Sequence, residues 1–493
     1  MYLPTITTIL YDERVQGALF LFVIGLEVFT EIRAWKVITH EFYKKVLFLA
    51  SRVTSIIGDY RSGKYYKPWK PHNAIVIVST KKHIAELSEA GCLSQRAVYA
   101  DMFGFKHTMN KFQHNTSEHK VIRTRLYSRM LQVNGPVHLD GLYPCLQSQL
   151  LANLDLELQS GRPSKDGISL PIAQMTRRLA SQLMSVMFFG QMLSSDEEFS
   201  NALLQYPRDM VRCMMAFQIT PSVASPLVHA ILTKRGQAMH IIQKRFLECM
   251  GSSRADWKEP EETKRFTIMH NMSELTTESD YWSPDLLSQS LLGIWFAASH
   301  QPWMNLHFIL VELCMREDWQ ARLRHELEQE APLDYKRLER LPLLDSFIKE
   351  TVRFNPLDKL AIRRKALEPY TFSDGTVSVP NGATVCVSAY DLMNDSRTYV
   401  APDTFNPERY LQSDPSKQQR KFTEVSETFP VWGYGSLACP GRFHASLVIK
   451  MIVSELLLKY DLKLEEPRAR TRWSWETFTM PYESTRIILK ERA

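Results

Sequence analysis

The strongest constraint on the fold is a long, almost wholly apolar segment in the second half of the chain. It begins at Ser283-Pro284-Asp285, where a serine N-cap, a first-turn proline and an acid near the positive end of the helix dipole predict a helix start. It continues as LLSQSLLGIWFAASHQPWMNLHFILVELCMRE, about 32 residues that are apolar on all sides. Such a helix must be covered by protein on every face, so the segment predicts a large, mainly helical protein built around it.

The remaining patterns add a small sheet component to the helices. Residues from about 115 to 330 have mostly helical patterns, Ala74–Val78 is typical of a strand, and residues 365 to 390 carry strand and turn signals. The predicted fold class is therefore mainly α with small β-sheets. We divide the chain into residues 1–59, an N-terminal anchor region with a linker, and residues 60–493, one large domain.

The anchor is predicted from an apolar run near the N-terminus. Residues 15–32 read VQGALFLFVIGLEVFTEI, which is slightly short for a membrane helix of about 20 residues. Asp12 and Glu13 precede the run, which disfavours a signal peptide. Basic residues between positions 33 and 45 would keep the rest of the chain on the cytoplasmic side of a membrane. A buried or surface amphipathic helix is the alternative for this run.

Composition narrows the chemistry. Lys and Arg exceed Asp and Glu by only six residues, which is not the charge pattern of a nucleic-acid-binding protein. The seven cysteines form no C-x-x-C pair, so neither a disulfide framework nor a zinc site is expected. Small-molecule chemistry is the better expectation, and one cysteine, Cys439, has unusual neighbours.

Cys439 lies in the segment 429–445, FPVWGYGSLACPGRFHA, which precedes an apolar helical run. Gly433 and Gly435 allow a backbone to press against a flat ligand, because they lack side chains. Pro440 follows the cysteine where a helix would begin, so the sulfur is expected near backbone N–H groups that favour a thiolate and lower its pKa. A thiolate held in this way is a metal ligand or a nucleophile.

The same segment also fits a dinucleotide-binding fingerprint. Gly433 to Ala438 matches G-x-G-x-x-A, and Asp461 follows at a suitable distance. Only 55 residues remain after Ala438, too few for the rest of a doubly wound domain, and Pro440 falls inside the turn that would open the phosphate-binding helix. The fingerprint is therefore disfavoured.

Two further motifs precede the cysteine segment. Glu350 and Arg353 share a helix face at i,i+3 spacing, and Pro356 should end that helix soon afterwards. Alone, such a pair is usually a solvated surface feature. A Pro-Glu-Arg segment ending at Arg409 lies between this helix and Cys439, which follows Arg353 by 86 residues. The order of the three motifs is far more specific than any one of them.

Together the motifs resemble those of the haem-thiolate monooxygenases, the cytochrome P450 family, over about residues 60 to 490. The variants WGYG and ACPGRF and the ending WETFTMPYESTRIILKER are similar to fungal microsomal members that tailor secondary metabolites. The resemblance implies the P450 fold, with haem between a long central helix and a C-terminal cysteine loop. It implies that Cys439 is the proximal haem ligand, with Trp432, Gly433 and Gly441 beside the cofactor.

The resemblance also implies roles for several arginines. Glu350 and Arg353, with Arg409, match a buried structural ion pair that holds the segment before the cysteine loop. The candidates for contacts with the haem propionates are Arg363, Arg364 and, more weakly, Arg123 and Arg125. Leu437 departs from the family pattern, which has His or Arg there.

A second departure falls on the central helix. Members usually carry an acid followed by an alcohol for proton delivery, whereas this chain has His300 and Gln301. Pro302 lacks an N–H, so the carbonyl of Ala298 should lose its helical partner and the helix should kink or widen. His300 is either a proton relay with a suitable pKa or a hydrogen-bonded core histidine. Gln301 could orient a water molecule.

By the same resemblance, an apolar substrate pocket is expected on the distal side of the haem. Its predicted lining comprises Trp295, Phe296, Ala297, Leu360, Ala361 and Thr477 to Met480, including Phe478. Aromatic and aliphatic walls suit a bulky hydrophobic substrate. For each of these residues, ordinary core packing is the equally weighted alternative.

The function implied by the resemblance is a haem b-dependent monooxygenase of the cytoplasmic face of the endoplasmic reticulum membrane. It would use O2 and electrons from NADPH through a separate flavoprotein reductase. A terpenoid, polyketide or alkaloid intermediate would be hydroxylated, desaturated or closed into a ring. The alternative is a haem-binding family member without monooxygenase activity, which the departures at Gln301 and Leu437 suggest.

Overall fold

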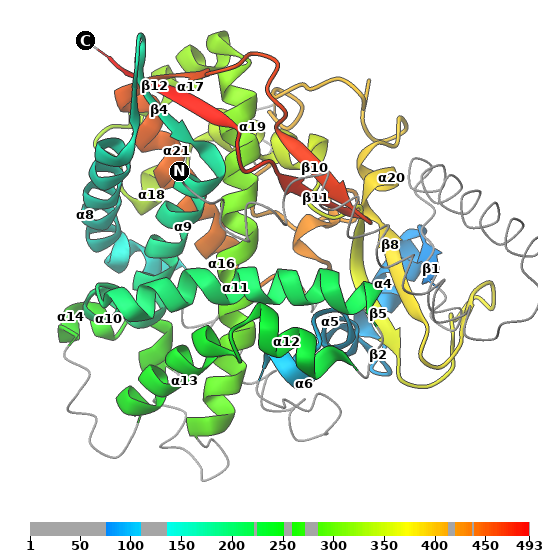
Figure 1. The fold of residues 1–493 in the computed structure, drawn as a ribbon. Helices are drawn as coiled ribbons and strands as arrows, with labels where there is room; N and C mark the ends of the chain where they lie inside the picture. The colour runs from blue at the N-terminus through cyan, green and yellow to red at the C-terminus, as the bar shows by residue number, and fades with distance from the viewer. Residues whose placement is uncertain are drawn as a thin grey trace, which may run out of the picture.

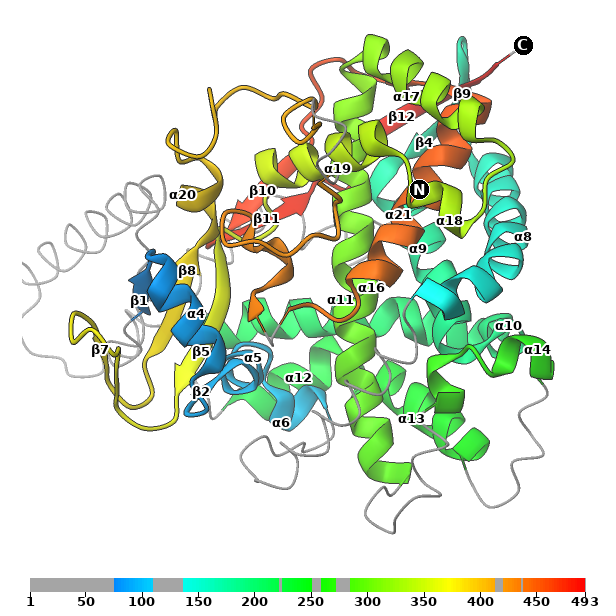
Figure 2. The same cartoon turned by 180° about the vertical axis from the view of Figure 1, so that it is seen from behind.

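The computed structural model describes residues 75–109, 136–220, 224–250, 259–271, 284–412, 420–435 and 438–492 (Figures 1 and 2). The predicted anchor at 15–32, the arginines Arg123 and Arg125, and Leu437 lie outside these residues. Within the described part of the chain, no helix is both long and apolar enough to cross a membrane.

The central element is α16 (Pro284–Cys314), which runs through the helical part of the molecule (Figure 1). It packs against α9 (Ile172–Phe189), α13 (Gln237–Met250), α19 (Pro342–Phe354) and α21 (Arg442–Lys459). This arrangement explains the apolar character of its sequence, since neighbouring helices enclose it on several sides. The helix is described from Pro284, whereas Ser283, its predicted N-cap, lies outside the described residues, and the element remains helical across Pro302.

The other helices surround this core. They are α4 (Lys81–Glu89), α5 (Gln95–Phe103), α6 (Phe105–Thr108), α8 (Pro136–Ser160), α10 (Gln191–Ser194), α11 (Glu197–Ile219), α12 (Ser225–Leu232), α14 (Glu261–Lys264), α17 (Glu317–Glu330), α18 (Tyr335–Leu338), α20 (Ala389–Met393) and the 3-10 turn η3 (Pro430–Trp432).

Two four-stranded sheets and two hairpins complete the described structure. Their strands are β1 (Ile75–Val78), β2 (Leu93–Ser94), β3 (Arg162–Ser164), β4 (Gly167–Pro171), β5 (Leu360–Ala366), β6 (Tyr370–Thr371), β7 (Ser378–Val379), β8 (Thr384–Ser388), β9 (Tyr460–Leu464), β10 (Arg472–Trp475), β11 (Phe478–Pro481) and β12 (Arg486–Glu491). The sheet orders are β1-β8-β5-β2 and β3-β4-β12-β9, and the hairpins are β10-β11 and β6-β7.

The predicted mainly α class with small sheets is confirmed. The strand expected at Ala74–Val78 is β1, and the signals in residues 365 to 390 belong to β5 to β8. The hairpin of β3 and β4 was not predicted. Its partner β12 follows more than 300 residues later, with Ile487 opposite Leu170, so no local pattern marks the pairing.

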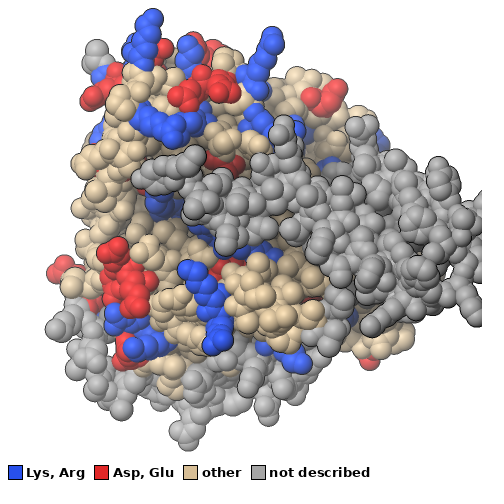
Figure 3. Space-filling view, viewed as in Figure 1, with Lys and Arg blue, Asp and Glu red and all other residues tan. Residues whose placement is uncertain are grey.

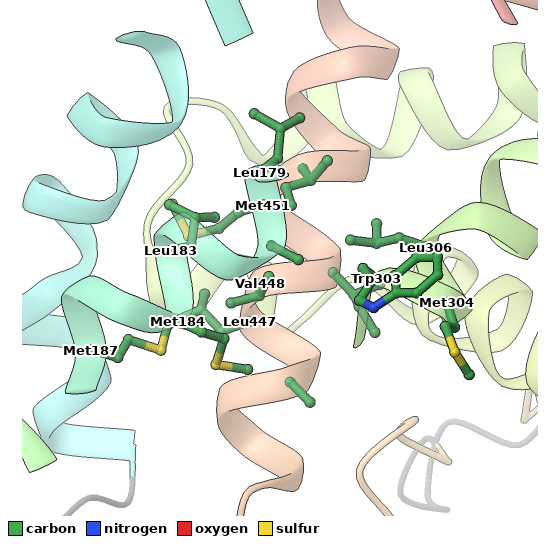
Figure 4. Close-up of a cluster of buried hydrophobic side chains, with 14 of the residues drawn as sticks. Leu179, Leu183, Met184, Met187, Trp303, Met304, Leu306, Leu447, Val448 and Met451 are labelled. Carbon is green, nitrogen blue, oxygen red and sulfur yellow. The ribbon is translucent and has the colours of Figure 1, made fainter. Parts of the chain in front are cut away.

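The core between α9, α16 and α21 is closely packed and apolar (Figure 4). Leu183 and Met184 of α9 lie beside Leu447 and Val448 of α21, and all four are almost completely buried. Each such side chain contributes about 1.5–3 kcal/mol by leaving water. This packing fixes the start of α21, and with it the segment that contains Cys439, relative to the central helix.

The surface carries mixed charge where the structure describes it. On the face drawn in Figure 3, Lys and Arg side chains lie among Asp and Glu side chains. This mixture agrees with the small net charge of +6.

Candidate haem-thiolate site

The cysteine segment is folded back on itself by its own backbone. Gly433 and Gly435 have φ values of 78° and 59°, in the left-handed region that favours glycine. The backbone N–H of Cys439 donates to the carbonyl of Trp432, and the indole N–H of Trp432 donates to the carbonyl of Phe422 at 2.7 Å. The glycines therefore make the reversal that brings the cysteine back beside η3.

Cys439 is partly buried two residues before Gly441, the N-cap of α21. Burial raises the pKa of its thiol, whereas the backbone N–H groups of Gly441 and Arg442 and the Arg442 cation act in the opposite direction. The sequence-based expectation of a net lowered pKa is therefore wrong for the protein without a bound metal. The N–H groups are nevertheless placed to stabilise a thiolate, and a coordinating metal ion deprotonates a thiol outright.

The central helix has one open face. Ala297 and Gln301 are exposed although they lie in the middle of α16, between fully buried residues such as Leu292 and Leu306. Residues four apart share a helix face, so the two side chains border the same space. The next residue in this series, Asn305, has a buried amide oxygen with no hydrogen-bond partner among the described residues. This face is thus open and polar at one end.

The two adjacent arginines of β5 differ sharply. Arg363 donates to both carboxylate oxygens of Asp358 at 2.8–3.0 Å and to the hydroxyl of Thr477 at 2.6 Å. Burial alone would lower the pKa of Arg363, but the Asp358 carboxylate raises it overall. Arg363 is therefore already neutralised within the protein.

Arg364 is 2% exposed and makes no ion pair with a described residue. It donates one hydrogen bond to the carbonyl of Arg363 at 2.9 Å, while its Nε is buried without a partner. Burial lowers the pKa of Arg364 to about 10. Because β5 contacts η3 of the cysteine loop, this uncompensated cation lies on the strand next to that loop. Of the two predicted propionate contacts, Arg364 has the free charge.

These features fit a flat, anionic metalloporphyrin. A cysteine sulfur faces backbone N–H groups, a buried cation lacks a counter-charge, and the central helix turns an open face with small and polar side chains. The donor set contains one thiolate, and the described residues offer no cluster of three or more metal-binding side chains. The fold and the site together have the features expected of a haem-thiolate protein, and Cys439 is the residue that would hold the metal.

The structure brings together the three residues of the predicted ion pair. Glu350 and Arg353 are completely buried and joined by two hydrogen bonds of 2.7 and 2.8 Å. Glu350 also accepts from the backbone N–H of Asn406 at 2.9 Å and from Arg409 at 3.2 Å. Arg353 donates to the carbonyl of Met393 at 2.8 Å. The cluster therefore ties α19 to the segment that leads toward the cysteine loop.

His300 is partly buried beside the open face. Its ring stacks on Phe296 with centroids 5.6 Å apart and meets Trp303 edge-on at 5.9 Å. Burial lowers the pKa of His300 to about 3, and the Arg177 cation adds to the effect. This pKa does not suit an imidazole that holds a proton at neutral pH, and the relay role of His300 stays a prediction. His300 does not match the alternative prediction of a hydrogen-bonded core histidine, because it forms no hydrogen bond with a described residue.

Trp295 does not line the open face. It is completely buried, packs against Phe188 and Phe189 of α9, and donates its indole N–H to the carbonyl of Leu203 at 3.0 Å. The prediction that Trp295 lines the substrate pocket is wrong, because Trp295 lies on the opposite side of α16 from Ala297. Core packing is the correct description of this residue.

The other predicted pocket residues divide into two groups. Ala297, Phe296 and Phe478 are exposed or partly buried, and β11 with Phe478 contacts α16. Leu360 is 3% exposed, and Thr477 is 4% exposed with its hydroxyl between Asp358 and Arg363. Thr477 thus holds the β5–β11 junction, and its side chain is already occupied by these partners.

Sequence reasoning missed three residues of this region. Phe103 of α5 packs on Phe296 with ring centroids 4.7 Å apart, Asp358 neutralises Arg363, and Arg177 of α9 lies over the Trp303 ring at 4.2 Å. Each of them either contacts a residue far away in the sequence or is a single residue of a common type, so no motif marks it. Asp358 alone carried a local signal, since it precedes the two arginines by five and six positions.

Comparisons with known proteins identify the family of the chain. The sequence model of the cytochrome P450 family matches residues 50–489, and the chain belongs to that family. Among its curated relatives is cytochrome P450 monooxygenase penP of Penicillium crustosum, 26% identical over 468 residues, which cover 90% of this chain and 87% of that protein. Another is cytochrome P450 monooxygenase paxP of Penicillium paxilli, 26% identical, with 92% and 88% covered.

A solved structure shows the same fold. Retinoic acid bound cyanobacterial CYP120A1 superposes with a TM-score of 0.64 at 16% identity, covering 85% of this chain and 89% of that one. The protein is therefore a P450 monooxygenase by family and by fold. When bound, the haem of this family supplies the activation of O2 from which one oxygen atom enters the substrate. The residues of this chain would hold its metal, neutralise its charge and shape its surroundings.

Proposed function

We propose that this monooxygenase oxidises a bulky hydrophobic intermediate of fungal secondary metabolism, of the terpenoid, polyketide or alkaloid class. The reaction is a hydroxylation, a desaturation or a ring closure at an unactivated C–H bond. The single observation that carries the substrate class is the open face of α16. There the small Ala297 lies next to Phe296, which Phe103 supports from α5.

The physical argument is one of shape and polarity. An alanine leaves room at the open face of α16, while the Phe103 and Phe296 rings, in edge-to-face contact, form a rigid apolar wall. Such a wall selects a large apolar substrate, because desolvating one contributes most of the binding free energy. The similarity to monooxygenases of Penicillium species supports a fungal biosynthetic role.

We also propose haem b as the cofactor and an NADPH-dependent flavoprotein as the electron donor, with residues 15–32 anchoring the enzyme to the cytoplasmic face of the endoplasmic reticulum. The apolar run and the basic residues after it support the anchor. A chimera that carries residues 1–59 fused to a fluorescent protein tests this placement. Retention in the soluble fraction after cell lysis would contradict it.

The decisive experiment uses the full chain purified in detergent with a fungal reductase. The reduced protein with carbon monoxide should give the spectrum of a thiolate-ligated haem, and Cys439→Ser should lose it. Cys92→Ser is the matched control, since Cys92 is also a partly buried free thiol outside the loop. It should keep the spectrum.

A panel of terpenoids, polyketides and alkaloids is then screened by the spectral shift that accompanies substrate binding. Compounds that bind are incubated with NADPH and 18O2, and products are analysed by mass spectrometry. Hydroxylation adds one 18O atom, whereas desaturation removes two hydrogens without adding oxygen. If only small polar compounds bind and react, the proposed substrate class is wrong.

A further inference from the structure

A small hollow lies behind the open face of α16, between that helix, α9 and α11. Its cavity volume is about 10 Å³, room for about one water molecule, and it is partly open to solvent. Arg177 and Ser181 of α9 contribute to its wall, as do Pro207 of α11 and Ser299 and His300 of α16. A space bordered by a hydroxyl, an imidazole and guanidinium groups is polar enough to hold water.

Prolines in both facing helices explain why the space remains there. Pro207 has no N–H, so the carbonyl of Leu203, four residues earlier, has no helical donor. The indole N–H of Trp295 supplies that donor at 3.0 Å. In the same way, Pro302 removes a donor from α16 one turn beyond Ala298. The two helices are thus held together by a side chain next to the hollow and not by close backbone packing at this point.

His300 lies between the hollow and the open face. In an α-helix, residues three apart differ by about 60° around the axis. His300 is three residues after Ala297, which is exposed on the open face, and three before Trp303, which lines the hollow. Its imidazole is therefore on the ridge of α16 that separates the two spaces. Since the ring bonds to no described residue, both of its nitrogens remain for water.

The surroundings of the His300 ring favour passing a proton through the imidazole over holding an extra proton on it. Burial and the nearby Arg177 cation lower the pKa of His300 and so keep its ring neutral at pH 7. A neutral imidazole has one donor nitrogen and one acceptor nitrogen. It can therefore accept a proton on one side while it releases a proton on the other.

An acid holds one of the arginines in the wall of the hollow. Arg177 pairs with Glu483, which follows β11 and has a side chain 29% exposed, and the Arg177 guanidinium also lies 4.2 Å from the centre of the Trp303 ring. Glu483 thus fixes the arginine at the wall of the hollow.

We propose that water in this hollow and the imidazole of His300 form the path by which protons reach the open face of α16. The path takes the place of the acid–alcohol pair that this chain lacks. A water molecule gives a proton to one ring nitrogen, the other nitrogen releases its proton toward the open face, and solvent replaces the proton that the water lost. Rotation of the ring restores the first tautomer. The proposal rests on the monooxygenase activity of the family and is independent of the substrate class proposed above.

The first test needs no substrate. A crystal structure of the haem-loaded enzyme should contain ordered water in the hollow, within hydrogen-bond distance of a His300 ring nitrogen. A dry hollow, or a His300 ring bonded to protein on both sides, overturns the proposal.

The second test compares two oxidant supplies with the panel compound that gives the largest spectral shift. With O2, each turnover consumes two electrons and two delivered protons, whereas hydrogen peroxide brings both with it. His300→Phe keeps the aromatic stack but has no nitrogens. It should form at least about tenfold less product per NADPH and release more peroxide, while its peroxide-driven rate stays within about twofold of the wild type.

Two further variants separate the path from general damage. Ser181→Met fills the hollow from α9 with His300 intact and should also uncouple the NADPH-driven reaction. Leu204→Met changes another lining residue with little change of volume and should leave coupling unchanged. Full coupling in His300→Phe, or an equal loss of the NADPH-driven and peroxide-driven reactions, would show that no protons travel this way.

Discussion

Arg363 and Arg364 are neighbours in β5, yet replacing each by methionine should have opposite effects on the protein without haem. Arg364 is buried with no described counter-charge, and its pKa falls from 12.5 to about 10. Since one pKa unit is worth about 1.4 kcal/mol, burying this cation costs about 3 kcal/mol at any pH below 10. Arg364→Met removes that cost together with one hydrogen bond worth about 1 kcal/mol. The apoprotein should therefore become about 1–3 kcal/mol more stable.

Arg364→Met should weaken the binding of haem, although it stabilises the apoprotein. If Arg364 neutralises a propionate, its loss removes a charge-assisted hydrogen bond of about 1.5–3 kcal/mol, and haem should dissociate roughly 10–100 times faster. Arg363→Met, in contrast, leaves the mostly buried Asp358 carboxylate unpaired and should destabilise the apoprotein by about 2–4 kcal/mol.

The measurements are urea denaturation of apoprotein made in haem-deficient cells and the rate of haem transfer to apomyoglobin. Arg363→Met is the matched control, because it removes the same charge one residue away. The reasoning is refuted if Arg364→Met destabilises the apoprotein as much as Arg363→Met does, or if it leaves haem transfer unchanged.

Three further predictions follow from the packing. Trp295→Phe should lower the free energy of unfolding, measured by thermal unfolding, by about 1–2 kcal/mol because the Leu203 carbonyl loses its donor. This loss should be smaller in a Pro207→Ala background, where the helix supplies an N–H to the same carbonyl. Equal losses in both backgrounds would contradict the assignment. Burial raises the pKa of Asp209 to about 6, so its contribution to stability is greatest below pH 4 and is lost as the pH rises toward 6. Asp209→Asn should therefore stabilise the protein by about 1–3 kcal/mol at pH 7 and have no effect below pH 4. Urea denaturation at a series of pH values measures the difference, and a difference that does not change with pH would rule this explanation out. Glu350→Gln should lower stability by about 3–5 kcal/mol, since two arginines lose their buried partner, and an unchanged melting temperature with normal haem content would exclude that role.

The local patterns identified several elements because the causes of those elements are themselves local. The start of α16 follows from a proline and an acid at the head of an apolar run, and the end of α19 follows from Pro356. The left-handed turns at Gly433 and Gly435 likewise follow from what a residue without Cβ can adopt. The Glu350–Arg353 pair has the same origin, since i,i+3 spacing on one helix brings the two side chains together.

Other features could not be found in this way. Trp295 and Ala297 are two residues apart in one apolar run, and only the positions of α9 and α11 decide that the first packs in the core while the second borders open space. The burial of His300, which lowers its pKa to about 3, depends on neighbours from three helices. A pKa follows from the surrounding dielectric and charges, and these are properties of the folded assembly.

The sequence by itself thus determined the family and the helix-rich class, and it predicts Cys439 as the metal ligand, because a cysteine with its glycines and proline carries its own backbone geometry. Only the tertiary structure decided which of two adjacent arginines has an unpaired charge and which side of α16 is open. Asp358 and Thr477 reach Arg363 but not Arg364, since consecutive strand residues point to opposite faces and a bulge separates Ala361 from Arg364. Long-range packing supplies the counter-charges and the cavities, and no local pattern records them.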